Sequence, residues 1–355
     1  MDNRPRLFGI NMSNRDYSKT DTWGKNQFNT SFPASLACYL YSKDVKAVYF
    51  KASKNMAINL SYIGIDELYG LNPLGKDIYF SFETQYTPYQ KYVIGSIPRN
   101  DLVILKNGQC VSSIEVKLVA LPDNSTCNLS EDNYGSEIVV RPDTIIYLAC
   151  SIIDGCNDRI HLKLLLGNEG EKIKDWSSPS EILKHIEGIY EAIKRIVRVN
   201  SSKQIPIIME PIWKTEGKSP RLANECLDVF VWSNLGMLNL FMPNDIKDIN
   251  TITRHTRTMI WLFKMLFDYA NNGRFDGARI IDELSYNLKN DKAFSSNGIR
   301  THKVMKCAEL KKPRIKKSEI KNIILGGGQN LLSPERRFDA IIYNSPDLFE
   351  EEERC

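Results

Sequence analysis

The stretch SIPRNDLVILKNGQCVSSIEVKLVALPD, residues 96–123, decides the predicted fold. It begins with a short apolar strand at residues 102–105 and continues into a second strand at residues 111–121, where apolar and polar side chains alternate. Between the two strands, Asn107 and Gly108 form a dipeptide that tolerates the positive φ angles of a tight hairpin turn. The stretch therefore predicts a β-hairpin.

Three charged residues of this hairpin share one edge. Side chains alternate along a strand, so Glu115 and Lys117 lie on one face, and the turn brings Asp101 near the same polar edge. Two carboxylates suit a hard divalent cation such as Mg²⁺, which also accepts phosphate oxygens. Such a cation polarises a phosphodiester and lowers the pKa of water, while a nearby lysine offsets charge on the phosphate. The catalytic candidates are therefore Asp101, Glu115 and Lys117, with Asp101 and Glu115 as metal ligands.

A Glu-x-Lys triplet also arises by chance on solvated strand faces. On that interpretation Lys117 is an exposed side chain that contributes little to the core. Three other Pro-Asp pairs lack a matching acidic-x-Lys triplet on a strand, so we interpret them as turns; they begin at Pro122, Pro142 and Pro346.

Patterns outside the hairpin add helices and a further strand. Helices are expected at residues 33–44, 177–198 and 254–270, and a strand at residues 46–52. Ser180 is the expected N-cap of the second helix. The apolar residues 143–154 fit a buried helix or a buried strand, because periodicity alone does not distinguish the two. The mixture predicts an α/β protein.

Composition excludes several classes of protein. The chain has 355 residues and a net charge of +4, too small a charge to indicate a polyanionic partner by itself. Its eight cysteines form no CxxC pair and its four histidines are widely spaced, which argues against a zinc site or a disulfide scaffold. No long uncharged apolar run exists, and the first residues carry charges where a signal peptide is apolar. We expect a cytoplasmic protein without a membrane span.

The last third of the chain contains a basic segment, residues 303–321, followed by an acidic tail. Such a run is usually a solvated surface, but beside a nuclease core it predicts contacts with DNA phosphates. The candidates are Lys303, Lys306, Lys311, Lys312, Arg314, Lys316 and Lys317. We therefore divide the chain into an N-terminal helix and strand region at 1–60, a catalytic core at 61–200, and a C-terminal elaboration at 201–355 that contacts DNA or a second subunit.

The residues Asp101, Glu115, Val116 and Lys117 resemble the PD-(D/E)xK nuclease motif, with Asn100 where that motif often has proline. Beyond the motif, roughly the first 155 residues are similar to the HindVP group of type II restriction endonucleases. The matching stretches are LFGINMSNRDYS, WGKNQFNTSFPASLACY, FETQYTPYQ, PRNDLVIL, EVKLVALPDNST and SEIVVRPDTIIYLA.

This resemblance implies a restriction-endonuclease-like α/β core, in which helices flank a mixed central sheet. It further implies dependence on Mg²⁺, a homodimer, and a duplex DNA substrate cut in both strands at a short palindrome to leave 5′-phosphate ends. The implied target is of the type GRCGYC. A DNA methyltransferase that protects the host is expected in the same system, without a stable complex.

The resemblance also suggests supporting acidic residues. Glu83 lies 18 positions before Asp101, and nucleases of this type often place an acidic residue of the preceding element near the metal; a surface glutamate is the alternative. Glu137 and Arg141 are four positions apart, and a structural ion pair competes with a role in supporting the site.

Two alternatives to a restriction endonuclease stay open at this point. One is a repair nuclease of the same fold that recognises DNA structure or cuts without specificity. The other is a catalytically inactive DNA-binding protein in which the triplet is coincidental. The three intact residues Asp101, Glu115 and Lys117 argue against the second alternative, because each chemical role is filled.

Overall fold

The computed structural model describes residues 23–76, 78–117, 138–156, 158–216, 222–243, 251–286, 288, 294–296 and 312–325. Its first half contains α1 (Trp23–Ser42), β1 (Ala47–Ala52), β2 (Ile58–Ile63), α2 (Ile65–Tyr69), β3 (Ile78–Gln85), η3 (Thr87–Tyr92), β4 (Arg99–Lys106), β5 (Gln109–Val116), β6 (Ile138–Val140) and α3 (Pro142–Gly155). The second half contains α4 (Arg159–Leu166), α5 (Glu169–Lys172), α6 (Pro179–Asn200), β7 (Pro206–Thr215), β8 (Leu222–Ser233), α7 (Asn234–Met237), η6 (Leu238–Leu240), α8 (Arg254–Asn272), α9 (Gly277–Glu283), β9 (Phe294–Ser296), β10 (Ile315–Lys316) and α11 (Lys317–Leu325).

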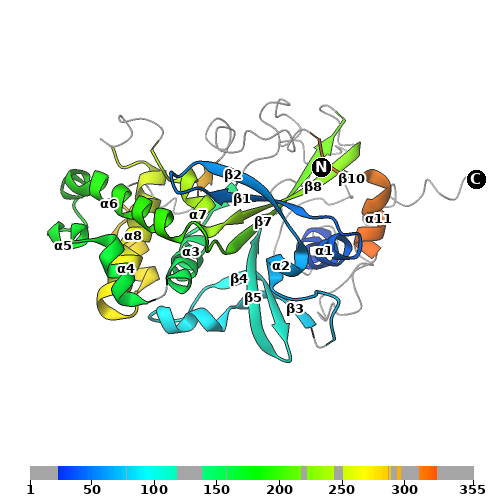
Figure 1. Cartoon of the computed structure of the whole chain (residues 1–355), viewed down its shortest axis with the longest axis horizontal. Helices are drawn as coiled ribbons and strands as arrows, with labels where there is room; N and C mark the ends of the chain where they lie inside the picture. Colours follow the sequence, from blue (N-terminus) through cyan, green and yellow to red (C-terminus); the bar gives the residue numbers. More distant parts are fainter. Residues whose placement is uncertain are drawn as a thin grey trace, which may run out of the picture.

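A mixed sheet runs through the centre of the molecule (Figure 1). Within the described ranges it has eight strands in the order β2-β1-β8-β7-β5-β4-β3, with β10 added alongside β8. The strands β3, β4 and β5 form an antiparallel meander, and β5 then pairs in parallel with β7. This arrangement confirms the predicted α/β class and the restriction-endonuclease-like core, in which helices flank a mixed sheet.

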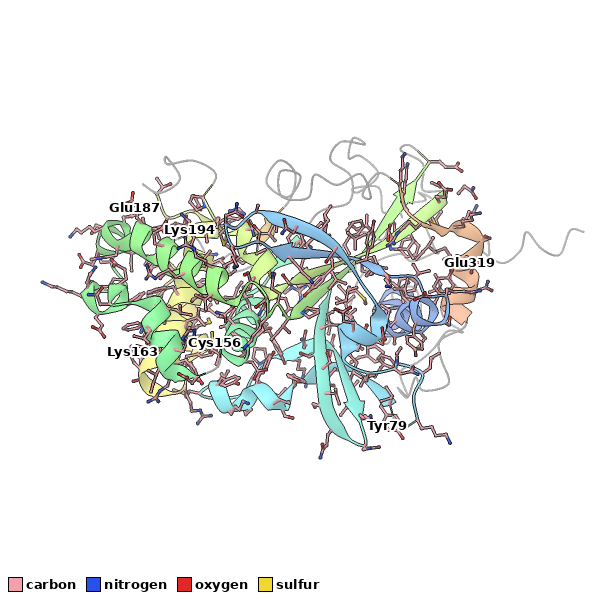
Figure 2. The ribbon with its side chains drawn as sticks, viewed as in Figure 1. Tyr79, Cys156, Lys163, Glu187, Lys194 and Glu319 are labelled. Carbon is pink, nitrogen blue, oxygen red and sulfur yellow. The ribbon has the colours of Figure 1, made fainter. Side chains whose placement is uncertain are left out.

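Each face of the sheet packs against its own group of helices. In β1, Val48 and Phe50 join the core under α3, α4, α6 and α8, whereas Ala47 and Tyr49 join the core with α1, α2 and α11. This division follows from the two-residue period of a strand, which sends successive side chains to opposite faces. Figure 2 shows side chains filling both layers, and Glu319 of α11 accepts a hydrogen bond from the Tyr39 hydroxyl of α1 at 3.0 Å. The sheet is thus held from both sides.

The predicted hairpin is present as β4 and β5. Asn107 and Gly108 form the turn with φ angles of 50° and 76°, the left-handed values that favour an Asn-Gly pair. The described part of β5 ends at Val116, and residues 118–121 of the predicted second strand lie outside the described residues.

The expected helices at 33–44, 177–198 and 254–270 are confirmed as α1, α6 and α8, except that α1 ends at Ser42 and α6 begins at Pro179. The ambiguous residues 143–154 are helical and belong to α3. The prediction of Ser180 as an N-cap is wrong by two residues. Ser178 caps α6 by accepting a hydrogen bond from the Glu181 amide, and Pro179 occupies the first turn, where its missing N–H costs nothing.

Strands from all three predicted regions meet in the one sheet. The central strands β7 and β8 belong to the predicted C-terminal elaboration, and they lie between β1 and β5. The domain boundaries therefore stay a prediction, with the core drawing on residues beyond 200. Within the described ranges, none of the helices combines the length and the apolarity that crossing a bilayer requires.

An ion pair with a buried aspartate holds the described part of the basic segment against the sheet. Asp228 of β8 is 1% exposed, and the Arg314 guanidinium donates to both of its carboxylate oxygens, at 2.9 and 2.7 Å. Arg314 also donates to the Lys46 carbonyl at 2.8 Å. The pair holds β10, and with it the start of α11, against β8.

We expect Arg314→Met to lower the free energy of unfolding by about 2 kcal/mol or more, because it leaves the buried Asp228 carboxylate without its partner. Urea denaturation measures this change. Lys312→Met, which removes an exposed charge of the same segment, is the control and should leave the midpoint almost unchanged. Equal stability of the Arg314→Met variant and the wild type would show that the Arg314–Asp228 ion pair does not stabilise the fold.

Candidate active site

The hairpin brings two carboxylates side by side. The register of β4 and β5 pairs Leu102 with Ile114, which places Asp101 level with Glu115. The Val116 amide donates a hydrogen bond to Oδ2 of Asp101 at 2.8 Å. Leu102 and Ile114 point into the core that contains α1, so Asp101 and Glu115 project from the opposite face of the sheet, toward α3.

Lys117 follows β5 directly and completes the group. Its amide donates to the Met209 carbonyl of β7 at 2.9 Å, which continues the parallel pairing, and its ammonium donates to Oε1 of Glu115. The interpretation of Lys117 as a solvated side chain is wrong, because this side chain is only 6% exposed. The neighbouring strand β7 removes it from water, and the ion pair with Glu115 stabilises the buried charge.

The first turn of α3 lies over the carboxylates. The Thr144 hydroxyl donates to Oε1 of Glu115 at 3.4 Å, and Pro142 occupies the start of the helix. The interpretation of Pro142-Asp143 as a turn is therefore wrong, since these residues begin a helix that packs on the site. Sequence reasoning missed Asp143 and Thr144; the available signal was Pro followed by Asp ahead of an apolar run, which is a helix start.

Burial and mutual repulsion shift the acidity of this group. The pKa of Asp101 is raised to about 7, first by burial and then by the negative charge of Glu115. The charges of Lys117 and Arg141 and the hydrogen bond from the Val116 amide act in the opposite direction. Burial and Glu115 also raise the pKa of Asp143. The site thus concentrates negative charge that a cation would stabilise.

The donor set fits a hard divalent cation. Among the described residues, no three His, Cys, Asp or Glu side chains converge as a preformed metal cluster. Mg²⁺ usually needs only one or two protein carboxylates, because waters and substrate phosphates complete its coordination. Hydrogen bonds reach Oδ2 of Asp101 and Oε1 of Glu115, and within the described part of the chain none reaches Oδ1 or Oε2. Each carboxylate therefore keeps one oxygen for a cation.

A second buried carboxylate lies beside the site. Val116 pairs with Met209, so Glu210 of β7 is level with Lys117 on the parallel strand. Glu210 is 2% exposed, and the Trp232 indole donates to its Oε2 at 3.3 Å. The available sequence signal is an acidic residue within the apolar strand IIMEPIW.

Two further acidic residues, Glu83 and Glu137, are predicted to support the site. Glu83 is exposed on β3, level with Asp101, and the charges that shift the Asp101 pKa belong to Glu115, Lys117 and Arg141. Glu137 lies outside the described residues, whereas Arg141 directly precedes α3. The supporting roles of Glu83 and Glu137 stay predictions.

The basic candidates are divided between described and undescribed residues. Lys303, Lys306 and Lys311 lie outside the described residues. Lys312, Lys316 and Lys317 are exposed, and Arg314 is bound by Asp228. The helix α11, which begins at Lys317, contributes to the core on the face of the sheet opposite Asp101. Contact of these residues with DNA phosphates stays a prediction.

The family model of the HindVP restriction endonuclease matches residues 23–349. The chain is 45% identical to "Type II restriction enzyme HgiDI" of Herpetosiphon aurantiacus, over 98% of both chains. It is 44% identical to "Probable type II restriction enzyme HindVP" of Haemophilus influenzae, over 98% of this chain and 96% of the relative. These matches define the class of protein as a type II restriction endonuclease, a site-specific deoxyribonuclease. The chain belongs to the HindVP restriction endonuclease family. No solved structure matches it.

The raised pKa of Asp101 predicts a pH-dependent cost of folding. The unfolded chain ionises this carboxyl near pH 4, whereas the folded protein keeps its proton up to about pH 7, so the folded state loses stability as the pH rises between these values. We expect Asp101→Asn, in EDTA, to raise the free energy of unfolding by roughly 1–3 kcal/mol at pH 8.

Denaturant unfolding at pH 8 and pH 4.5 measures this difference. At the lower pH the gain should largely disappear, because Asp101 is then protonated in the folded protein and partly protonated in the unfolded chain. A gain of the same size at both values would show that it does not come from ionisation of Asp101.

Proposed function

We propose that this restriction endonuclease hydrolyses phosphodiester bonds in duplex DNA with Asp101, Glu115 and Lys117 as its catalytic residues and Mg²⁺ as its cofactor. The observation that carries the proposal is the convergence of these three side chains at the β4–β5 hairpin, with one oxygen of each carboxylate left for a cation. Asp101 and Glu115 would hold the ion. When bound, Mg²⁺ supplies a Lewis acid that polarises the phosphodiester and makes water a better nucleophile.

The protein groups have separate tasks in this reaction. Lys117 stabilises the Glu115 carboxylate in the absence of substrate, and its ammonium offsets negative charge that develops on the scissile phosphate. Attack of water on phosphorus breaks the bond to the 3′ oxygen, which takes up a proton and leaves as a hydroxyl. The other product carries a 5′-phosphate. The Lys117 side chain is only 6% exposed, and this limited access of water strengthens its electrostatic effect.

Exposed arginines beside the carboxylates favour a polyanionic substrate. Arg99 lies two residues before Asp101 on β4 and so projects from the same face, and Arg141 precedes the first turn of α3. Both are exposed. Guanidinium groups bind phosphates with paired hydrogen bonds, so these two positions suit DNA phosphates that flank the scissile one.

The biological setting follows from the family. We infer a homodimer that cuts both strands of a palindrome, because two copies of one site related by a two-fold axis match the symmetry of such a sequence. The proposed target is GRCGYC, and the proposed location is the cytoplasm. A methyltransferase of the same system would protect host DNA. A nonspecific repair nuclease is less favoured, since the curated relatives are named type II restriction enzymes.

We expect Asp101→Asn and Glu115→Gln to abolish cleavage while DNA binding is largely retained, because each change removes a metal ligand without removing the DNA-contacting surface. Lys117→Met should lower the cleavage rate by about a hundredfold or more. Cleavage is followed on plasmid DNA with Mg²⁺, and binding by gel shift in EDTA. Lys194→Met, on the exposed surface of α6, is the control. Cleavage near the wild-type rate by Asp101→Asn or Glu115→Gln would overturn the site.

Digestion of plasmid and phage DNA tests the specificity. Discrete fragments whose ends map to GRCGYC and carry 5′-phosphates are expected. A smear would indicate a nonspecific nuclease, whereas discrete ends at another sequence would refute the target and leave the nuclease proposal intact. Sedimentation of the protein on a duplex with one site tests the dimer, and a monomer on that duplex would contradict it.

A further inference from the structure

The Glu115 carboxylate is held at one oxygen by two donors from different elements. The ammonium of Lys117 and the hydroxyl of Thr144 both donate to Oε1. Thr144 is itself 2% exposed, so its hydroxyl is directed at Glu115 away from bulk water. Two donors on Oε1 fix the rotation of the carboxylate about its last bond and leave Oε2 on the other side.

The helix that carries Thr144 is anchored independently of Glu115. One turn further along α3, the Tyr147 hydroxyl donates to the Pro98 carbonyl at 2.9 Å and accepts from the Tyr86 amide at 3.1 Å. Pro98 directly precedes β4, and Tyr86 directly follows β3. Loss of the Thr144 hydroxyl would therefore leave α3 in place and remove only one of the two donors that orient the carboxylate.

We propose that Thr144 is a positioning residue that orients the Glu115 carboxylate so that Oε2 faces the divalent cation. This inference rests on the proposed function, in which Glu115 is a metal ligand. Groups that hydrogen-bond to a ligating carboxylate fix its orientation, and their loss weakens both metal binding and turnover. Thr144 touches neither the cation nor the DNA in this proposal and acts through Glu115 alone.

Variants that differ in one hydroxyl group test the proposal. Thr144→Val keeps the shape of the side chain and removes the hydroxyl, and Thr144→Ser keeps the hydroxyl. The control is Thr258→Val in α8, since Thr258 is also a buried helical threonine, but its hydroxyl donates to the Arg254 carbonyl of its own helix. The readouts are the equilibrium binding of Mn²⁺ to the protein, followed by the paramagnetic resonance of the free ion, and the Mg²⁺ dependence of single-turnover plasmid cleavage.

We expect Thr144→Val to weaken Mn²⁺ binding and to raise the half-saturating Mg²⁺ concentration by about tenfold, with Thr144→Ser and Thr258→Val within about twofold of wild type. A purely structural role would lower the melting temperature of Thr144→Val without changing either ion dependence, and that result would overturn the proposal. If Thr144→Val fails to fold, Thr144→Ser and Thr144→Ala provide the same comparison, because they also differ only in the hydroxyl.

The two proposals fail in different ways. If Glu115→Gln cleaves like the wild type, the assignment of the site fails and the role of Thr144 fails with it. If Glu115→Gln is inactive but Thr144→Val has wild-type ion dependence, Glu115 remains a ligand and only the positioning role is refuted.

Discussion

The ion pair between Lys117 and Glu115 is the interaction on which the site depends. Both side chains are largely buried, and a buried charge is tolerated only with a partner of opposite sign. The pair forms because β5 continues into parallel pairing with β7, which covers Lys117 and keeps it on the same face as Glu115. Mutual compensation of the two charges lets the protein keep a lysine and a carboxylate in a place from which water is mostly excluded.

The surrounding fold keeps this pair in place by packing on both faces of the sheet. Strand residues alternate between the core beneath α3, α6 and α8 and the core beneath α1 and α11, so neither face can shift without opening a packed layer. On the α3 side, the hydrogen bonds of Tyr147 connect the helix to the ends of β3 and β4. The carboxylates therefore lie between a hydrogen-bonded hairpin and a helix that is anchored to the ends of its strands, an arrangement that favours preorganisation of their oxygens for a cation and DNA.

Two interpretations drawn from the sequence are wrong, for different physical reasons. The sequence allows Lys117 to be interpreted as a solvated side chain, because charged and apolar residues alternate along its strand. The strand that buries it, β7, is about 90 residues away in the chain. The pair Pro142-Asp143 is interpreted as a turn from the sequence because Pro and Asp favour turns. The same two residue types also favour the first turn of a helix, and the structure places them at the start of α3. Arg314 is predicted as a phosphate contact because its neighbours are basic; the structure adds its ion pair with Asp228 of β8, and its contact with DNA stays a prediction. The burial of Lys117 and the ion pair of Arg314 thus depend on distant residues, whereas the conformation of Pro142-Asp143 is a local choice between a turn and a helix start.

The sequence by itself determined the hairpin with its Asn-Gly turn, the amphipathic helices α6 and α8, and the three chemically distinctive residues, because these depend on local conformational preferences and on spacing within a short segment. Its similarity to known restriction endonucleases also determined the family. Only the tertiary structure decided that β7 and β8 occupy the centre of the sheet and that Thr144 reaches Glu115. It also decided that Asp101 is buried enough to hold its proton to about pH 7. These features depend on contacts between residues far apart in the chain, and burial and charge interactions are properties of that assembled neighbourhood.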